Sequence, residues 1–341
     1  MKKNYILPKI FLTVLMLLIS CSQSNQFSEI KGSYLGQEPP GIKAKVFAPG
    51  IICGDMYERD VAMTPDGKEM YFGVIVGNNT YSAIVITKQI DGRWTKPEIA
   101  PFSSNPETRN LEPHITPDGK KFLFVSNRSA EGTENGEDNW DIWAMDWVGD
   151  GWSEPYNLGA PINTEVGEFF PSVTREGTLY FTREEPNRLN GIYRSRLVAG
   201  KYTEPERLPS QVNCGRSRYN AFIAPDESYI IVPAFAGPGS FGGTDYYIVF
   251  RNQNDQWSQP LNMGEEINSA SGFEWSAYVS PDSKYLFFMS VREEKRESFE
   301  SVPLTLERMQ QRQRSFNNGN PNIYWMSASV LDSLKQHAVF E

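Results

Sequence analysis

The stretch Thr116-Pro117-Asp118-Gly119, with the apolar run Phe122-Leu123-Phe124-Val125 soon after it, decides the fold because the chain contains it in five versions. The versions begin at residues 64, 116, 174, 224 and 280, and Thr174-Arg175-Glu176-Gly177 is the most degenerate. Proline presets φ at the first central turn position, while Asp and Gly favour the rest of a tight turn. A turn that recurs about every 50 to 58 residues predicts the repeated blades of a β-propeller.

The residues around each turn predict four strands per repeat. An apolar second strand follows the turn, and a third strand follows a variable loop. The fourth begins with an aromatic residue and a proline, as in Trp94-Thr95-Lys96-Pro97. Aromatic and β-branched residues favour strands, and proline is tolerated at strand ends. Five such repeats predict an all-β fold, a five-bladed β-propeller of four-stranded antiparallel blades.

The two ends of the repeat region predict how the ring closes. The fifth repeat lacks a fourth strand, because only residues 327–341 follow its third strand. The segment 46–52 resembles the end of the second repeat, and we expect it to supply the missing strand and remove two exposed sheet edges. Residues 43–341 are therefore predicted to form one propeller, with a terminal helix at 330–335. A helical insertion is expected at about 292–320, where charged helix-forming residues alternate.

The first 42 residues predict export and a lipid anchor. Lys2 and Lys3 precede an apolar run, 10–19, that is too short to span a bilayer and ends in Leu18-Ile19-Ser20-Cys21. This ending resembles the lipobox of bacterial lipoproteins, whose cysteine becomes the lipidated first residue; the alternative is an ordinary signal peptide. We expect a signal peptide at 1–21, lipidation at Cys21 and a flexible tether at 22–42. The domain would then lie outside the cytoplasm in the cell envelope, with the lipid in a membrane that we expect to be the outer membrane.

Composition narrows the possible functions. The net charge of −9, with no basic cluster except one short stretch near the end, argues against a nucleic-acid partner. Only His114 and His337 are present, too few for a histidine-based metal site, and we expect His114 to pack in the core. Cys53 and Cys214 lie in loops of non-adjacent repeats, which favours free thiols over a disulfide. No phosphate-binding glycine loop is found, and no cofactor is predicted.

The repeats resemble a known family. The Thr-Pro-Asp-Gly turns, the strand Asp141-Ile142-Trp143 and the phrase Trp152-Ser153-Glu154-Pro155 look like the WD40-like, TolB-type (PD40) propeller repeats of bacterial envelope proteins. The resemblance covers nearly all of the predicted mature chain and implies a binding or scaffolding part of the envelope. It implies the fold more strongly than the role, because such folds serve many functions. The chain departs from the pattern at Arg175-Glu176 and in the insertion at 292–320.

The strand order predicts two different faces. The Pro-Asp-Gly turns share one face of the disc, here called the turn face. The loops between second and third strands and those between blades share the opposite loop face. Because variable loops on a rigid scaffold usually carry function, we predict that the loop face binds the partner. Its long, varied segments are 127–139, 184–190, 236–244 and 292–320.

Polar residues of the five first strands are predicted to converge on the axis. Aligning these strands on their turns gives a mouth column of Glu58, Asn110, Glu168, Arg218 and Glu274. Two residues further in stand Asp60, Glu112, Phe170, Asn220 and Ser276, while Arg59 and its counterparts are expected to pack between blades. Eight members of the two columns form a candidate ligand-binding site: Glu58, Asp60, Asn110, Glu112, Glu168, Arg218, Asn220 and Glu274. The alternative is a water-filled channel whose polar groups satisfy one another.

Two hypotheses about function follow. The first is binding of an envelope protein or a glycan without catalysis. The second is a glycoside-active enzyme that uses carboxylates at the pore, Asp60, Glu112 and Glu168, as the paired acids of glycoside hydrolysis. Binding is favoured because the local sequence lacks the motifs of glycosidase propellers. The insertion is either a lid or docking arm or a solvated excursion, and the acidic loop at 131–141 is interpreted as solvated rather than as a calcium site.

Overall fold

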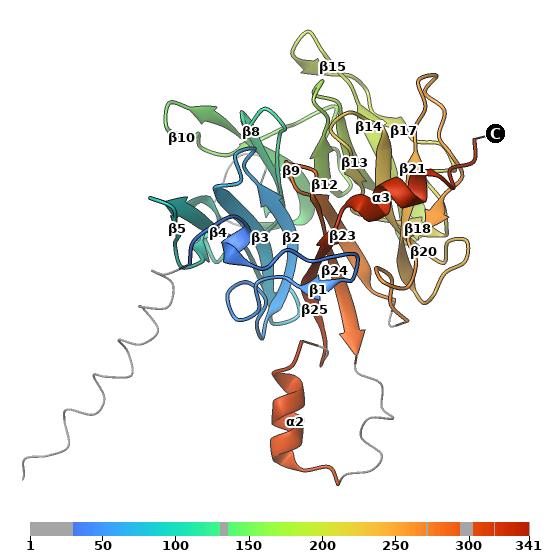
Figure 1. Cartoon of the computed structure of the whole chain (residues 1–341). Coiled ribbons are helices and arrows are strands. Elements are labelled where there is room, and N and C mark those ends of the chain that lie inside the picture. Colours follow the sequence, from blue (N-terminus) through green and yellow to red (C-terminus); the bar gives the residue numbers. More distant parts are fainter. Residues whose placement is uncertain (1–29, 130–135, 271, 294–302, 317, 341) are drawn as a thin grey trace, which may run out of the picture.

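Five antiparallel sheets surround a common axis, and each is one blade of a β-propeller (Figure 1). This computed structural model describes residues 30–129, 136–270, 272–293, 303–316 and 318–340. The predicted signal peptide with Cys21, residues 22–29 of the predicted tether, most of the acidic loop and residues 294–302 of the insertion lie outside the described residues. The five-bladed fold predicted from the repeats is confirmed.

In blades 1 to 4 the strands follow chain order from the axis outward, and in blade 5 the N-terminal β1 is the outermost strand. Blade 1 contains β2 (Tyr57–Met63), β3 (Glu69–Val76), β4 (Tyr81–Ile90) and β6 (Glu98–Ile99). Blade 2 contains β7 (Asn110–Ile115), β8 (Lys121–Arg128), β9 (Gly136–Val148) and β11 (Tyr156–Asn157). Blade 3 contains β12 (Glu168–Val173), β13 (Leu179–Glu185), β14 (Leu189–Ser195) and β17 (Glu206–Arg207). Blade 4 contains β18 (Ser217–Arg218), β19 (Phe222–Ile223), β20 (Tyr229–Phe235), β21 (Thr244–Phe250) and β22 (Leu261–Asn262). Blade 5 contains β23 (Glu274–Val279), β24 (Tyr285–Glu293), β25 (Asn318–Ser327) and β1 (Lys45–Val46).

The outer strands correct one detail of the predicted repeat. The aromatic residues expected to open the fourth strands lie instead in short ribbons at the ends of the third strands. These ribbons are formed by β5 (Arg93–Trp94), β10 (Gly151–Trp152), and β15 (Leu197–Val198) with β16 (Lys201–Tyr202). In blades 1 to 3 the outermost strand begins only after the proline, because proline cannot donate a ladder hydrogen bond.

The repeated turns are built by side-chain hydrogen bonds. In blade 2 the Thr116 hydroxyl donates to Asp118 Oδ1 (2.6 Å) and accepts from the Lys121 amide (3.0 Å), and Gly119 has a φ of 71°. In blade 5 the corresponding position is Ser283, which adopts a φ of 59° without the freedom of glycine. The short polar motif seen in the sequence is therefore sufficient to form the turn.

The ring closes through an N-terminal strand, as predicted. β1 pairs antiparallel with β25, with Lys45 opposite Trp325 and Val46 opposite Tyr324. Phe47 follows β1 and is fully buried, with its ring 5.1 Å from that of Trp325. Closure by a strand from the other end of the chain removes the open edges of blade 5.

The segment before β1 is packed against the propeller, which corrects the second half of the predicted tether. The Trp94 Nε1 donates to the Gly32 carbonyl (2.8 Å), the Tyr34 hydroxyl donates to Asp282 Oδ1 (2.7 Å), and Leu35 is buried. Further along, the Ser327 amide donates to the Gly41 carbonyl (2.8 Å). Residues 30–41, here called the N-terminal strap, thus join blade 1 to blade 5, because apolar and hydrogen-bonding groups in this stretch find partners on both blades.

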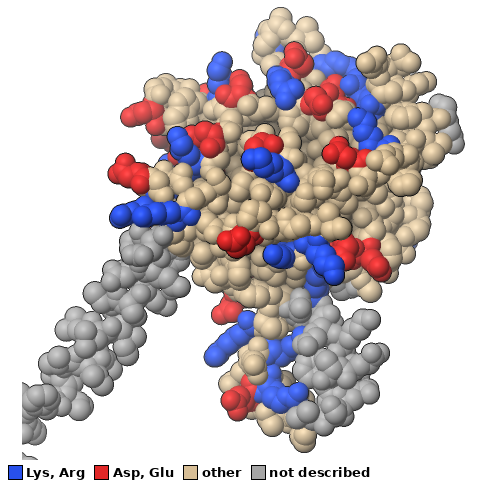
Figure 2. Space-filling view, in the orientation of Figure 1, with Lys and Arg blue, Asp and Glu red and all other residues tan. Residues whose placement is uncertain are grey.

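Two helices lie near the C-terminal end of the chain. α3 (Ser329–Lys335) confirms the predicted terminal helix, and beyond it the Gln259 amide of blade 4 donates to the Val339 carbonyl (2.8 Å). α2 (Leu306–Gln313) is the described helix of the insertion, has no buried residue and projects away from the disc (Figure 1). Figure 2 shows acidic and basic side chains intermixed over the visible face, including the region of α2.

Large side chains between neighbouring blades form the core. Between blades 1 and 2, for example, Tyr71 and Phe122 are buried with their ring centroids 4.8 Å apart, and Phe122 also packs against Trp152 (5.5 Å). Full burial of an apolar side chain of this size contributes about 1.5–3 kcal/mol. The alternating apolar strands therefore stabilise the ring blade by blade and hold its axial residues in place.

Candidate functional site

The inner column of predicted site residues sits on a backbone irregularity that recurs in the blades. Four first strands shift register within their first three residues, just after Arg59, Leu111, Phe169 and Glu274. The residues at the inner-column position take positive φ in blades 1 to 4, with values of 57° at Asp60, 58° at Glu112, 52° at Phe170 and 42° at Asn220. A bulge re-aims the side chains beside it, and left-handed φ costs a non-glycine residue about 1–3 kcal/mol. Blades 1 to 4 thus share a strained backbone conformation at this position, which turns the inner-column side chains toward the axis.

Five residues from four blades form a connected network at the axis, here called the axial cluster: Arg59, Asp60, Glu112, Asn220 and Ser276. Arg59 Nη2 donates to Glu112 Oε1 (2.9 Å) and to the Ser276 hydroxyl (3.2 Å), and its Nε lies 2.7 Å from Asp60 Oδ2. Ser276 also donates to Asp60 Oδ1, and Asn220 Nδ2 donates to Glu112 Oε1 (3.0 Å). The second oxygen of Glu112 accepts from the Phe170 amide (2.7 Å), so all five blades contribute a group.

The axial cluster is buried, which sets its electrostatics. No member exposes more than 7% of its surface. Burial raises the pKa of Glu112 to about 7, because a carboxylate loses hydration there, although Arg59 opposes the shift. The Arg59 guanidinium lies between two carboxylates. Each of these charged groups already bonds a group from another blade: Arg59 bonds Glu112, and Asp60 accepts from Ser276.

Three glutamates of the mouth column do not reach the axis. The Glu58 carboxylate accepts from the Gly54 amide (3.1 Å). Glu168 accepts from the Thr164 amide (2.9 Å) and from Arg183 Nε (2.8 Å), and Glu274 accepts from the Ser269 amide (2.9 Å). Each of these side chains bonds the loop that precedes its own inner strand, so they fix the inter-blade loops. Burial raises the pKa of Glu58 and of Glu274 to about 7.

The other two members of the mouth column, Arg218 and Asn110, also bond nearby loop residues. Arg218 donates to the carbonyls of Cys214 (3.3 Å), Gly215 (3.0 Å) and Asn190 (3.2 Å), and Asn110 Nδ2 donates to the Thr108 hydroxyl (3.3 Å). Of the eight predicted site residues, the structure therefore brings together Asp60, Glu112 and Asn220.

Arg59 is the residue that the sequence analysis placed wrongly. It was expected to pack between blades, yet its guanidinium holds the axial cluster together. A signal was present in the sequence, since Arg59 is the one charged member of a column whose other members are Leu111, Phe169, Tyr219 and Trp275. A lone cation among apolar residues at a buried position requires anionic partners.

The space beside the axial cluster is small. A cavity of ≈ 10 Å³ lies between Asp60, His114 and Phe170, which is about the room that one water molecule requires. His114 packs there as predicted: its Nε2 accepts from the Val173 amide (2.9 Å), and burial lowers its pKa to about 4. A sugar ring does not fit between these carboxylates.

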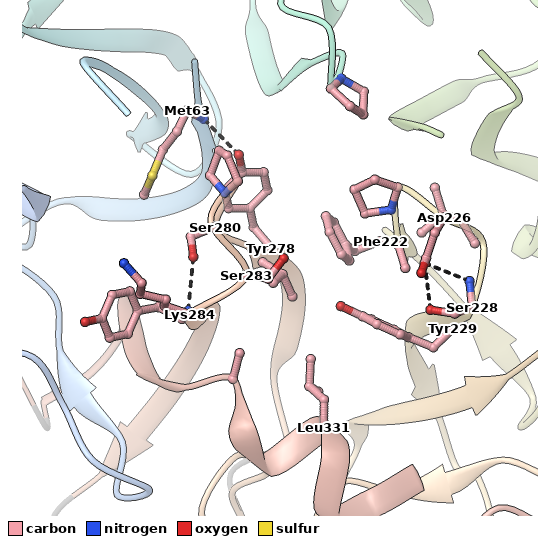
Figure 3. A pocket seen from close by; sticks show the side chains of 18 of the residues that line it. Met63, Phe222, Asp226, Ser228, Tyr229, Tyr278, Ser280, Ser283, Lys284 and Leu331 are labelled. Atoms are coloured by element: carbon pink, nitrogen blue, oxygen red, sulfur yellow. Dashed lines mark hydrogen bonds between the residues drawn. The ribbon is translucent and has the colours of Figure 1, made fainter. Parts of the chain in front are cut away.

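A much larger hollow, of ≈ 750 Å³, opens on the turn face and is here called the turn-face funnel. Figure 3 shows Phe222, Tyr229 and Tyr278 around the space and Leu331 of α3 at one side. Its rim is made by the repeated turns, which contribute the rings of Pro65, Pro117, Pro225 and Pro281. The volume lies within the range of small-ligand sites.

The polar groups of the funnel are mostly engaged with the turns that carry them. The Tyr278 hydroxyl accepts from the Met63 amide (3.2 Å), and Asp226 Oδ1 accepts from the amide (3.1 Å) and hydroxyl (2.6 Å) of Ser228. Burial raises the pKa of Tyr278 and of Tyr229, so both hydroxyls stay protonated at neutral pH. The funnel therefore offers aromatic surface with hydroxyl donors at its edge.

Sequence reasoning missed the funnel because it predicted an interaction site on the opposite, loop face. The turns are short and alike, which hid the fact that five of them enclose one space. Its wall also includes Pro40 of the N-terminal strap and Leu331 of α3, two segments from opposite ends of the chain. The available signal was a proline at the same turn position in four of the five repeats, spaced around the predicted ring.

The described part of the chain was expected to hold no histidine-based metal site and no disulfide between Cys53 and Cys214. Within it, no group of three or more His, Cys, Asp or Glu side chains is arranged to hold a metal ion. Among the described helices, none has the length and apolar character needed to cross a membrane. Cys53 and Cys214 are buried free thiols, in agreement with the expectation for this pair.

Comparisons with known proteins find distant structural similarity only. No protein-family profile and no curated protein sequence matches the chain. TolB from Acinetobacter baumannii is similar with 19% identity and a TM-score of 0.44, over 68% of this chain and 48% of that chain. The putative TolB from Agrobacterium tumefaciens has 13% identity and a TM-score of 0.45, over 80% of this chain and 90% of that chain. A protein of unknown function from Dyadobacter fermentans has 14% identity and a TM-score of 0.42, over 74% and 80%.

The chain thus spans about half the length of the A. baumannii TolB that it matches. At these identities the similarity extends to the β-propeller fold alone.

Proposed function

We propose that this protein is a lipid-anchored binding protein of the cell envelope that takes an extended segment of a partner protein in its turn-face funnel, without catalysis. The observation that carries the proposal is the funnel itself, an open hollow of ≈ 750 Å³ lined by aromatic rings and prolines on a rigid ring of blades. Lipidation at Cys21 and placement in the outer membrane rest on the sequence of the signal segment.

The chemistry of the lining favours a peptide segment as the ligand. Phe222, Tyr229 and Tyr278 provide ring surface, and tyrosine combines this with a hydroxyl that can bond a peptide carbonyl. The proline rings of the rim add apolar surface at low entropic cost, since their conformation is already fixed. Such a surface suits an apolar side chain flanked by polar backbone better than it suits a sugar, which requires several directed hydrogen bonds around each ring.

The state of the axial carboxylates supports binding over the glycoside-active alternative. Asp60 and Glu112 share Arg59, and Glu112 also accepts from Asn220, within a space that admits about one water. Glu168 is held by Thr164 and Arg183. A pair of glycosidase carboxylates must instead face a sugar from two sides.

Site-specific photo-crosslinking in the native envelope tests the proposal. A crosslinking amino acid would replace Ser283, an exposed residue of the funnel rim, and in a matched control would replace Met309, which is exposed on α2. We expect a defined partner protein to crosslink at 283 and not at 309. Crosslinks from position 309 alone would contradict a site in the funnel and favour one on the loop face. The lipid anchor has its own test: Cys21→Ala should release the protein from the membrane.

A further inference from the structure

We infer that Arg175 makes the turn-face funnel selective for a partner segment that carries a carboxylate. This inference rests on the proposed function and names the chemistry of the ligand. Arg175 lines the funnel at the point where the turn of blade 3 departs from the repeat.

The departure places a cation where the other blades have an apolar ring. Four turns contribute a proline to the funnel, and in blade 3 the same turn position is Arg175. The first turn hydrogen bond is kept, since the Gly177 amide donates to the Thr174 carbonyl (3.0 Å) as the Gly119 amide donates to that of Thr116 (2.8 Å). The turn then closes one residue earlier: the Thr174 hydroxyl accepts from the Thr178 amide (3.0 Å), whereas the Thr116 hydroxyl accepts from the Lys121 amide. Blade 3 therefore changes both the chemistry of the rim and the length of the turn.

The backbone of Arg175 is fixed by a bond that proline is unable to make. Its amide donates to the Pro225 carbonyl of the next blade (2.7 Å), and proline has no N–H to donate. The turns of blades 3 and 4 are thereby tied together. This contact positions the start of the Arg175 side chain beside Pro225 and Asp226.

Among the described residues, no hydrogen bond or ion pair engages the Arg175 guanidinium. Its charge does act on the neighbouring Asp226: burial raises the pKa of that carboxyl, but hydrogen bonds from Ser228 and, to a smaller extent, the charge of Arg175 lower it overall. Asp226, the neighbouring carboxylate, is engaged by Ser228 through both its amide and its hydroxyl. The other cation of the funnel, Lys284, already pairs with Asp282 (3.2 Å). Arg175 is thus an exposed, positioned cation at the edge of a hollow whose lining mixes aromatic rings and prolines with polar groups.

A carboxylate is the group that this arrangement suits best. Guanidinium binds carboxylate through two parallel hydrogen bonds, and the pair is stronger beside apolar surface than in open water. The carboxylate can come from an Asp or Glu side chain or from a free C-terminus, and both present the same two oxygens. Asp332 of α3 also lines the funnel and supplies an acidic position for comparison.

Peptide selection on the purified, signal-cleaved chain tests the inference. Two random-peptide libraries would be used, one displaying internal segments and one ending in a free carboxylate. Each would be selected on the unchanged chain, on Arg175→Gln and on Asp332→Asn. Gln at 175 retains the amide bonded to Pro225, so the turn should fold normally, which the thermal unfolding midpoint would verify.

We expect acidic residues to be enriched at one fixed peptide position, or a free C-terminus to be required. Binding of the selected peptides should weaken by about 10-fold or more in Arg175→Gln and should persist in Asp332→Asn. Enriched peptides that lack a carboxylate, or that bind Arg175→Gln equally well, would overturn the inference and leave the proposed function standing. Absence of any funnel-dependent peptide would contradict both.

Discussion

The axial cluster and the turn-face funnel occupy the same axis and are built from the same inner strands, yet they differ in every property that matters for binding. The axial cluster is polar, buried and internally satisfied, with Arg59 bonded to groups from three blades. The funnel is open, its lining mixes aromatic rings and prolines with polar groups, and among the described residues its cation without an ion pair is Arg175. The comparison teaches that charged residues that converge on the axis can serve to hold the blades together. The surface proposed to bind a partner lies instead in the open funnel between the repeated turns.

The largest expected effect comes from breaking the axial joint. Arg59→Met removes the cation that lies between Asp60 and Glu112, and a buried pair that loses one partner costs about 3–5 kcal/mol. Chemical denaturation would measure this loss in the free energy of unfolding. The control is Arg196→Met, whose half-exposed ion pair with Glu206 should contribute at most about 1 kcal/mol. Equal effects at the two sites would contradict the structural role of the cluster.

A second effect should come from the funnel and should appear in binding. Tyr229→Ala removes a ring from the funnel wall, and we expect at least about a 2 kcal/mol loss of ligand affinity, as for a central aromatic of an interface. Titration calorimetry with a selected peptide would measure it. Tyr229→Phe separates the ring from the hydroxyl and should retain most of the affinity. In Glu112→Gln, which alters the axial cluster alone, peptide affinity should be unchanged; a change there would mean that the two regions are coupled.

The buried carboxylates predict how stability varies with pH. Burial raises the pKa of Glu58 and Glu274 to about 7 in the folded chain, above their value in the unfolded chain. The folded state therefore binds more protons between about pH 4.5 and 7. The free energy of unfolding should fall as pH rises through this window, by on the order of 1 kcal/mol or more.

Thermal melts in matched buffers at several pH values would measure this slope. Glu274→Gln should reduce the slope, because its amide does not titrate. An unchanged slope in this variant would exclude Glu274 as a source of the pH dependence.

The smallest expected effect concerns the turns that form the rim. Ser283 holds a φ of 59°, whereas Gly119 occupies the equivalent position of blade 2. Ser283→Gly should stabilise the chain by about 0.5–1 kcal/mol because it relieves this strain. Gly67→Ser is the reciprocal variant in blade 1, where φ is 67° and an added Cβ meets no atom within 4 Å, and it should destabilise by a similar amount. Thermal unfolding would resolve both changes.

The parts of the molecule that the sequence predicted are those governed by local or repeating patterns. Turn chemistry at Thr116-Pro117-Asp118-Gly119 and the missing fourth strand of the last repeat were enough to predict five blades and closure by the segment at 46–52. The inner column was placed correctly for Asp60 and Glu112, because their spacing from the turn is constant.

The remaining features depend on three-dimensional geometry that the spacing of residues along the sequence does not specify. The bulge after Arg59 reverses the expected alternation of side chains, so an arginine assigned to the space between blades enters the axis. The glutamates Glu58, Glu168 and Glu274 share a column, but each finds closer partners in its own loop. The funnel combines turns from five blades with α3 and the N-terminal strap, and no local pattern predicts that they meet.

The N-terminal strap would have a mechanical consequence if the chain is anchored at Cys21 as proposed. A pull transmitted from the membrane side reaches the domain at residue 30, where the Trp94 amide donates to the Ile30 carbonyl (2.9 Å) and Trp94 Nε1 holds Gly32. The load falls on blade 1 before it reaches β1, the two-residue strand that closes the ring. The strap would thus transfer a pulling force to blade 1 and spare the two-residue pairing of β1 with β25, which closes the ring.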